Sequence, residues 1–248
     1  MVTEVRKVSL AAPAYNEEAG IAEIVQAWLS YLRTLDWLEE FEIVICNDGS
    51  TDSTAKILAE LAAANPEVKP VYLVKNQGAA VALTTAIAHT TMPWVLLIDS
   101  DGQFPIEDVV PMAAAINESK ADVAAGVRHA KLDSAFARFG SWSSARVANW
   151  FHKSHLKDFN CALKLVNGNL LRSLHLEAKG LNYSTDVTSK LLERDAKFVE
   201  VVIDHKLREK GQSSLKVVKG ATHRLLFVLY IGFRQFLLRA QVLRKESP

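Results

Sequence analysis

Short apolar runs alternate along the first half of the chain with longer segments whose apolar positions recur at helical spacing. Short apolar runs predict buried strands, and the longer periodic segments predict amphipathic helices. Strands are therefore expected at Val5–Ala12, Phe41–Cys46, Val71–Val74, Trp94–Ile98 and Val123–Val127. Helices are expected between them at Glu17–Leu35, Thr54–Ala64, Ala79–His89 and Ile106–Asn117. This order predicts an α/β fold, with a mostly parallel, doubly wound sheet flanked by helices.

The regular alternation of predicted strands and helices ends after Val127. Arg128–Lys157 carries six Lys or Arg residues and one Asp, with aromatic residues between them, and is expected to be helical or loop-like. The remaining expected elements are a strand at Ala162–Val166, a turn at Asn167–Asn169, a helix at Ser184–Arg194, a strand at Phe198–Ile203, a polar loop at His205–Ser214 and one or two amphipathic helices at Leu215–Leu243.

Composition adds a charge asymmetry. The 248 residues are 49% apolar, enough for a sizeable core, and the formal net charge is only +1. From His205 onward, however, ten Lys or Arg residues stand against two Glu, whereas the preceding residues carry 19 basic and 26 acidic side chains. A basic end on an acidic body predicts an anionic partner. No nucleic-acid-binding motif is present, so nucleic acid is not expected as that partner.

Two features favour a cytoplasmic protein. Cys46 and Cys161 lie far apart without metal-ligand spacing, so neither a disulfide framework nor a zinc site is expected. An ordinary strand follows Lys7 at once, so no signal peptide is predicted. The apolar run Leu225–Phe233 is too short to span a bilayer.

The most informative stretch follows the predicted strand Trp94–Ile98 and contains two carboxylates, Asp99 and Asp101. Open α/β sheets bind ligands at the carboxyl ends of their strands, where this pair is expected. Two carboxylates so close repel each other unless a cation lies between them. Mg²⁺ and Mn²⁺ prefer such oxygen ligands, and Gln103 adds a neutral oxygen. The stretch predicts a metal site that carries a diphosphate, whereas an isolated pair is equally typical of a solvated Asp-Gly turn.

Polar loops follow three further predicted strands, at Pro13–Glu17, Asn47–Asp52 and Lys75–Gly78. The carboxyl ends of parallel strands meet at one edge of a sheet. One polar loop there would mean little, but four predict a nucleotide-binding cradle.

Together the four loops resemble those of the family 2 glycosyltransferases of the GT-A (Rossmann-like) fold, closely over residues 7–130 and more loosely to about 215. The resemblance implies that Tyr15 and Glu17 line the base and ribose pocket, that Asp48 accepts a hydrogen bond from the base, and that Gly78 lets the backbone approach the diphosphate. The implied donor contacts are Pro13, Tyr15, Glu17, Asp48, Gly78, Asp99 and Ser100. The implied ligands of Mg²⁺ or Mn²⁺ are Asp99, Asp101 and Gln103. The resemblance also implies a catalytic role for Asp101. The form D-x-D-x-Q is similar to that of the polyprenyl-phosphate sugar synthases, which resemble dolichyl-phosphate mannose synthase.

The second half supports that subfamily through Gly126–Arg128, Asp158–Lys164 and His205–Ser213. The resemblance implies that Arg128, Arg138 and Arg208 bind an acceptor phosphate, for which the planar guanidinium is suited. A phosphate monoester is already ionised near neutral pH, so Asp158 would orient groups or accept a remaining proton as the second catalytic residue. The implied reaction is a metal-dependent, inverting transfer of a hexose from a UDP- or GDP-sugar to polyprenyl or dolichyl phosphate.

These matches divide the chain into a glycosyltransferase domain at residues 1–214 and an amphipathic helical tail at 215–248. Within the domain, residues 1–127 are expected to bind the nucleotide sugar and residues 128–214 the acceptor. The apolar tail, flanked by Arg224, Arg234, Arg239 and Arg244, predicts peripheral binding at the cytoplasmic membrane face. Packing of the tail on its own domain, or on a second copy in a homo-oligomer, is the alternative.

Three other functions stay open. A transferase acting on a glycan or small-molecule hydroxyl would need Asp158 or Asp186 as an essential base. Leu96–Gly102 also resembles the nucleophile motif of haloacid-dehalogenase phosphatases, although it follows the fourth strand rather than the first and Gln103 replaces the usual Thr. The third is a non-catalytic nucleotide-sugar-binding subunit. A dehydrogenase is disfavoured because no G-x-G-x-x-G follows the first strand.

Overall fold

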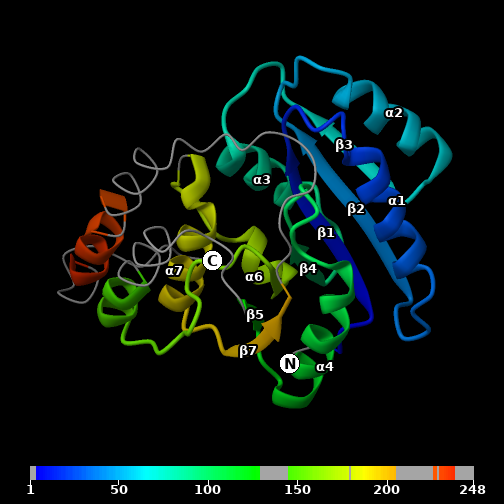
Figure 1. The fold of residues 1–248 in the computed structure, drawn as a ribbon. Coiled ribbons are helices and arrows are strands. Elements are labelled where there is room, and N and C mark those ends of the chain that lie inside the picture. Colours follow the sequence, from blue (N-terminus) through cyan, green and yellow to red (C-terminus); the bar gives the residue numbers. More distant parts are fainter. Residues whose placement is uncertain (1–3, 129–144, 179, 205–225, 228, 238–248) are drawn as a thin grey trace.

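The computed structural model describes residues 4–128, 145–178, 180–204, 226–227 and 229–237. Within them lies a seven-stranded sheet in the order β3-β2-β1-β4-β6-β5-β7 (Figure 1). The strands are β1 (Lys7–Ala14), β2 (Glu40–Asn47), β3 (Val68–Tyr72), β4 (Trp94–Leu97), β5 (Val123–Arg128), β6 (Lys164–Asn167) and β7 (Phe198–Ile203). The helices are α1 (Ile21–Leu32), α2 (Thr54–Ala64), α3 (Ala79–Ala88), α4 (Val109–Ser119), α6 (Gly168–Arg172) and α7 (Tyr183–Glu193), with short 3₁₀ turns η1 (Ile106–Asp108) and η2 (Gly180–Asn182).

The sheet is mostly parallel, as the sequence predicts. Among the described strands only β6 runs against its neighbours, and it lies between β4 and β5. Parallel strands are joined by helices that cover both faces, so their side chains are buried on both sides. All four residues of β4 are accordingly buried. The α/β class and the flanking helices are confirmed.

Neighbouring residues of β1 show how the two layers form. Leu10 belongs to a core cluster with α1, α2 and α4, whereas Ala11 belongs to one with α3, α6 and α7. Successive side chains of a strand point to opposite faces of the sheet. The sheet is therefore covered by helices on both faces.

One predicted strand is misplaced. The sequence predicts a strand at Val71–Val74, but β3 spans Val68–Tyr72 and includes Pro70. β3 pairs only with β2, so it is an edge strand, where a proline costs no inward hydrogen bond. Val74 lies beyond the strand and is fully exposed.

Helix starts also differ from the prediction. The helix expected from Glu17 begins at Ile21, because the carbonyl of Glu17 first accepts hydrogen bonds from the N–H groups of Gly20 and Ile21 in a turn. The turn expected at Asn167–Asn169 is instead the start of α6. There Asn167 Oδ1 accepts from the N–H groups of Asn169 and Leu170, which is helix capping.

Two helical segments lie outside the sheet. Residues 145–152 are helical, within the stretch expected to be helical or loop-like. Residues 226–227 and 229–237 are also helical, within the predicted tail; we call residues 229–237 the C-terminal helix. In Figure 1 it is the red helix at the far side of the molecule from β3. No helix in the described part of the chain has the length and apolar character needed to cross a membrane.

Candidate active site

The carboxyl ends of β1, β2 and β4 lie level with one another at one edge of the sheet. Ala14 pairs with Asn47 in the β1–β2 ladder, and the N–H of Asp48 donates to the carbonyl of Ala14 at 2.8 Å. On the other side of β1, the hydroxyl of Ser100 donates to the carbonyl of Pro13 at 2.7 Å. The structure thus brings the predicted donor-binding residues of three different loops together.

Asp48 has a role that the sequence did not reveal. Its buried carboxylate accepts hydrogen bonds from the N–H groups of Gln77 at 2.7 Å and Gly78 at 2.8 Å. These bonds hold the loop that precedes α3. Gly78 has a φ of 95°, a conformation that favours glycine. The base contact predicted for Asp48 stays a prediction, and a carboxylate retains lone pairs for it.

Gly49 makes this loop arrangement possible. Its φ is 63°, and a Cβ atom added to it would lie 2.4 Å from the carbonyl carbon of Lys75. The backbones after β2 and β3 therefore approach more closely than any side chain at residue 49 permits.

The loop after β1 is joined to the loop after β2 by Asn16. Its side-chain oxygen accepts from the N–H of Thr51 at 2.9 Å, and its own N–H donates to the Ser50 hydroxyl at 3.0 Å. Tyr15 beside it is exposed and Glu17 is half-buried, so both border solvent at the predicted pocket edge. Asn16 is a further site residue, and it lies within the polar loop Pro13–Glu17, although no residue pattern there distinguishes it.

The acidic pair follows β4 in a tight turn. Asp101 Oδ1 accepts from the N–H of Gln103 at 3.1 Å, and Gly102 between them has a φ of 75°. Asp99 is only partly exposed. Desolvation, and then the negative charge of Asp101, raises the pKa of Asp99 from 3.8 to about 6. The charge of Asp101 is therefore close enough to oppose the ionisation of Asp99.

Tyr183, the first residue of α7, donates a hydrogen bond from its hydroxyl to Asp99. Burial, and then the charge of Asp99, raises the pKa of Tyr183 well above its ordinary value, so the phenol keeps its proton. Tyr183 is a site residue that the sequence motifs do not predict. Its only local signal was a tyrosine at a helix start, and the contact spans 84 positions of the chain.

A buried cluster of charges lies beside Asp99. Arg128 binds Asp158 through two hydrogen bonds, Nε to Oδ2 at 2.7 Å and Nη2 to Oδ1 at 3.0 Å. Antiparallel β6 places Lys164 opposite Leu97, two residues before Asp99. Lys164 is buried and donates to the carbonyl of Cys161 and to the Ser184 hydroxyl.

The charges of this cluster act on one another. Burial lowers the pKa of Lys164 from 10.5 to about 8, against the opposing influence of Cys161, Asp158 and other nearby groups. Lys164 and Arg128 in turn favour the ionised form of Asp99. The predicted acceptor-side residues Arg128 and Asp158 therefore lie close enough to the predicted metal ligands for their charges to interact. Lys164 belongs to the same cluster, although the sequence did not indicate a role for it.

The remaining predicted residues are Arg138, Arg208 and Asp186. Arg138 and Arg208, expected to bind the acceptor phosphate, lie outside the described residues, as does the basic loop at His205–Ser213. Asp186, the alternative base, is buried in α7. Its Oδ2 accepts from the N–H groups of Glu177 and Ala178, whereas its Oδ1 has no hydrogen-bond partner among the described residues.

The donor set suits a divalent cation that is only partly bound by protein. Within the described part of the chain, no cluster of three or more His, Cys, Asp and Glu side chains exists, so a fully protein-coordinated metal has no site there. Mg²⁺ is usually bound by one or two carboxylates together with water and phosphate oxygens. Two partly exposed carboxylates that repel each other, with Gln103 beside them, fit that pattern.

Comparison with solved structures defines the class of fold. The chain is similar to glucosyl-3-phosphoglycerate synthase from Mycobacterium tuberculosis in complex with UDP, with 18% identity, a TM-score of 0.69, and coverage of 92% of this chain and 81% of that one. The same enzyme in complex with Mn²⁺, UDP-glucose and phosphoglyceric acid matches with 17% identity and a TM-score of 0.68, over 92% of this chain and 80% of that one. The expected GT-A fold is confirmed.

The family follows from the sequence. The model of glycosyl transferase family 2 matches residues 9–168, which is more than half of the chain. The chain belongs to this family and is a glycosyltransferase. This result removes the phosphatase interpretation of Leu96–Gly102.

Proposed function

We propose that this enzyme transfers a hexose from a UDP- or GDP-sugar to polyprenyl or dolichyl phosphate. The observation that carries the proposal is the neighbourhood of Asp99 and Asp101. There an acidic pair suited to a metal lies near two cations, the buried Lys164 and the partly buried Arg128. A reaction between a nucleoside diphosphate sugar and a phosphate monoester brings several negative charges together. Cations on both sides of the reacting atoms reduce that repulsion.

The donor would occupy the edge formed by the loops after β1, β2, β3 and β4, in the half of the domain at residues 1–127. Asp99, Asp101 and Gln103 would hold Mg²⁺ or Mn²⁺, which supplies charge neutralisation for the departing nucleoside diphosphate. The similar structures from M. tuberculosis that contain Mn²⁺ together with UDP or UDP-glucose support this assignment. Pro13, Tyr15, Glu17 and Asp48 would orient the nucleotide, with Gly78 and Ser100 near the diphosphate.

The state of Asp158 favours a phosphate acceptor. Both of its oxygens accept hydrogen bonds from Arg128, and its side chain is 1% exposed, so it is poorly placed to remove a proton from a hydroxyl. An ionised phosphate needs no such base. Arg128, with Arg138 and Arg208, would bind the acceptor phosphate in the half at residues 128–214, and Asp158 would position Arg128.

A second candidate acceptor is a small phosphorylated molecule that reacts through a hydroxyl. It is favoured by the similar structure that contains phosphoglyceric acid and by the buried Asp186, whose Oδ1 has no hydrogen-bond partner among the described residues. In that reaction Asp186 or Asp158 would be an essential base.

The test incubates the purified enzyme with labelled UDP- and GDP-sugars, Mg²⁺ or Mn²⁺, and either a short-chain polyprenyl phosphate or phosphoglyceric acid. We expect a lipid-linked hexose that disappears with a chelator and falls at least about 100-fold in Asp101→Asn. Asp36→Asn is the matched control, since it removes an exposed carboxylate in the loop that enters the amino end of β2, away from the carboxyl ends that form the site. Transfer only to phosphoglyceric acid would favour the second candidate. Donor hydrolysis without transfer to either acceptor would contradict both.

A further inference from the structure

The C-terminal helix (229–237) exposes an apolar stripe. Leu229, Phe233 and Phe236 are spaced by four and three residues, so they lie on one face, and the two phenylalanines are 60% and 62% exposed. Leu226 continues the stripe one turn earlier and is also exposed. Ile231, by contrast, is only 1% exposed and faces the domain. The helix therefore has both a buried face and an exposed apolar face.

Ion pairs fix this orientation. Arg234 lies 3.0 Å from Glu193 and 3.5 Å from Glu177, and the Tyr230 hydroxyl donates to Glu177 at 3.2 Å. Peripheral membrane binding by the predicted tail would place its flanking basic side chains toward anionic headgroups. For Arg234 this expectation is wrong, because its guanidinium faces the domain and pairs with Glu177 and Glu193. The charged side of the helix is thus used internally, which leaves its aromatic side outward.

The helix at residues 145–152 widens the same surface. A Cβ atom on Gly232 would lie 2.3 Å from the Phe151 ring, so the two helices are in close contact at that glycine. Next to it Trp150 is 74% exposed, and its ring packs edge-on against Phe151 at a centroid distance of 4.8 Å. Trp150 and the exposed residues of the C-terminal helix therefore belong to neighbouring helices; we call Trp150, Leu226, Leu229, Phe233 and Phe236 the aromatic face.

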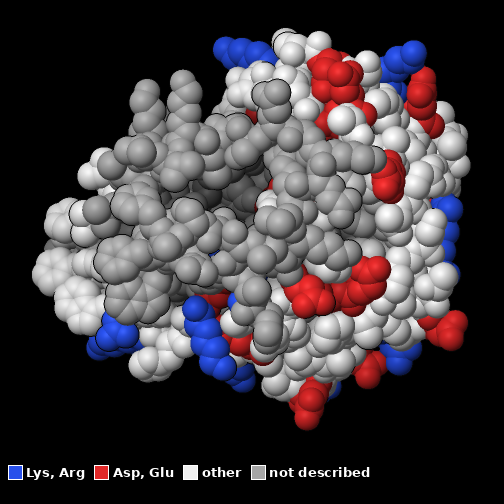
Figure 2. Space-filling model, viewed as in Figure 1, with Lys and Arg blue, Asp and Glu red and all other residues white. Residues whose placement is uncertain are grey.

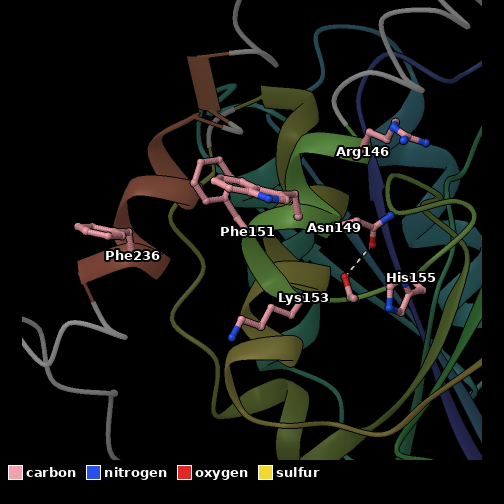
Figure 3. A pocket seen from close by; sticks show the side chains of 8 residues that line it. Arg146, Asn149, Phe151, Lys153, His155 and Phe236 are labelled. Atoms are coloured by element: carbon pink, nitrogen blue, oxygen red, sulfur yellow. Dashed lines mark hydrogen bonds between the residues drawn. The ribbon is translucent and has the colours of Figure 1, made fainter.

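A groove of about 800 Å³ lies beside the aromatic face (Figure 3). Trp150, Phe151 and Phe236 contribute apolar walls, and Arg146, Lys153 and His155 contribute nitrogen groups. The lining contains no Asp or Glu. Figure 2 shows white side chains over the C-terminal helix with Lys and Arg nearby, whereas most Asp and Glu of that view lie toward the other end of the molecule.

This combination of groups identifies the partner by its chemistry. Exposed Trp and Phe side chains beside Lys and Arg suit the boundary between headgroups and acyl chains of an anionic bilayer. A second copy of the chain fits less well, because a twofold contact places the same patch on both sides and would bring Lys153 toward its own symmetry mate.

We propose that the aromatic face docks this enzyme on anionic membranes, with Lys153 toward the lipid phosphates. The inference deepens the proposed function, on which it rests, because a polyprenyl phosphate is reached only at a bilayer surface. It also specifies the membrane-facing side of the tail, which is the stripe opposite Arg234.

The test measures binding of the full chain to sedimented vesicles of phosphatidylcholine with and without phosphatidylglycerol. The vesicles contain no polyprenyl phosphate and no nucleotide sugar is added, so the result is independent of the transfer reaction. We expect Phe233→Ser combined with Phe236→Ser to weaken vesicle binding about 100-fold, because the variant lacks two aromatic rings that would be buried in the bilayer. Lys153→Gln should weaken binding about fivefold, and only when phosphatidylglycerol is present.

Val74→Ser is the control, because Val74 is a fully exposed apolar residue just beyond the edge strand β3 and should leave vesicle binding unchanged. Circular dichroism checks that each variant is folded. Absence of wild-type binding, or equal binding by the double variant, would overturn the proposal. So would a wild-type dimer in light scattering that becomes a monomer in the double variant, because that result assigns the aromatic face to a second copy. Transfer to a water-soluble short-chain acceptor, measured separately, reports on the proposed function alone.

Discussion

The buried pair Arg128–Asp158 allows the sharpest test of how the acceptor side is built. We consider Arg128→Met, Asp158→Asn and the combined variant. Each single change removes one charge of a pair joined by two hydrogen bonds, whose side chains are 13% and 1% exposed. The combined change removes both charges. Lys164 and Asp99, which have opposite charges, then remain as neighbours of each other.

The magnitude follows from burial and from the position of Lys164. Leaving one partner of a buried pair uncompensated costs about 3–5 kcal/mol of unfolding free energy. Arg128→Met should lie near the lower value because Lys164 still compensates Asp158. Asp158→Asn should lie near the upper value because it leaves Arg128 and Lys164 to repel each other. At about 2–4 °C per kcal/mol, Tm should fall by about 6–12 °C and about 10–20 °C, respectively.

The assay is urea unfolding of the three variants and the wild type, arranged as a double-mutant cycle. The combined variant should be at least about 2 kcal/mol more stable than the sum of the single effects predicts, because the uncompensated charge is gone. Single effects below about 1 kcal/mol, or strictly additive ones, would refute a coupled buried pair. Well below Tm, Asp158→Asn should retain transfer to polyprenyl phosphate within about tenfold, whereas a loss of several orders of magnitude would make Asp158 a base.

Three further outcomes are expected. Burial by itself would raise the pKa of Glu42, but hydrogen bonds from Lys69, Ser9 and Thr91 outweigh it and hold the pKa below the ordinary value of 4.5. The stability from this lowered pKa is present at neutral pH and is lost as pH falls through and below 4.5, so acid unfolding should show a smaller pH dependence in Glu42→Gln; identical pH profiles would contradict this. Gly49→Ala should raise the Kd for the nucleotide sugar about tenfold or more in calorimetry, because the added Cβ displaces the loop that Asp48 holds, and unchanged binding would show that the loop tolerates the shift. Tyr183→Phe should weaken Mn²⁺ binding about tenfold in a titration followed by electron paramagnetic resonance, through loss of the hydrogen bond to Asp99, and equal affinity would exclude a positioning role.

The sequence predicted the first half of the fold well because that half is built from local repeats. Buried parallel strands appear as continuous apolar runs, and the helices between them have their own periodicity. Errors occurred where a local signal was ambiguous. Pro70 disfavours a strand prediction, so the start of the edge strand β3 was missed. Asn167 was assigned to a turn because asparagine is common in turns, but it caps a helix.

The site was predictable in part for the same reason. Asp48, Asp99 and Asp101 follow strands whose carboxyl ends must meet at one edge, so their proximity follows from strand order and direction. The loop-holding role of Asp48, and the contacts of Lys164 and Tyr183, depend on residues far away in the chain. No periodicity or local motif contains that information.

The sequence by itself determined the alternation of strands and helices, the acidic pair after β4, and the helical segment at residues 229–237, because each is encoded by neighbouring residues. Tertiary structure alone decided that antiparallel β6 places Lys164 beside Leu97, that Arg128 binds Asp158, and that Arg234 turns inward. Which partner a charged side chain meets, and which face of a helix stays exposed, is set by packing between distant segments. Local propensity does not specify such long-range contacts.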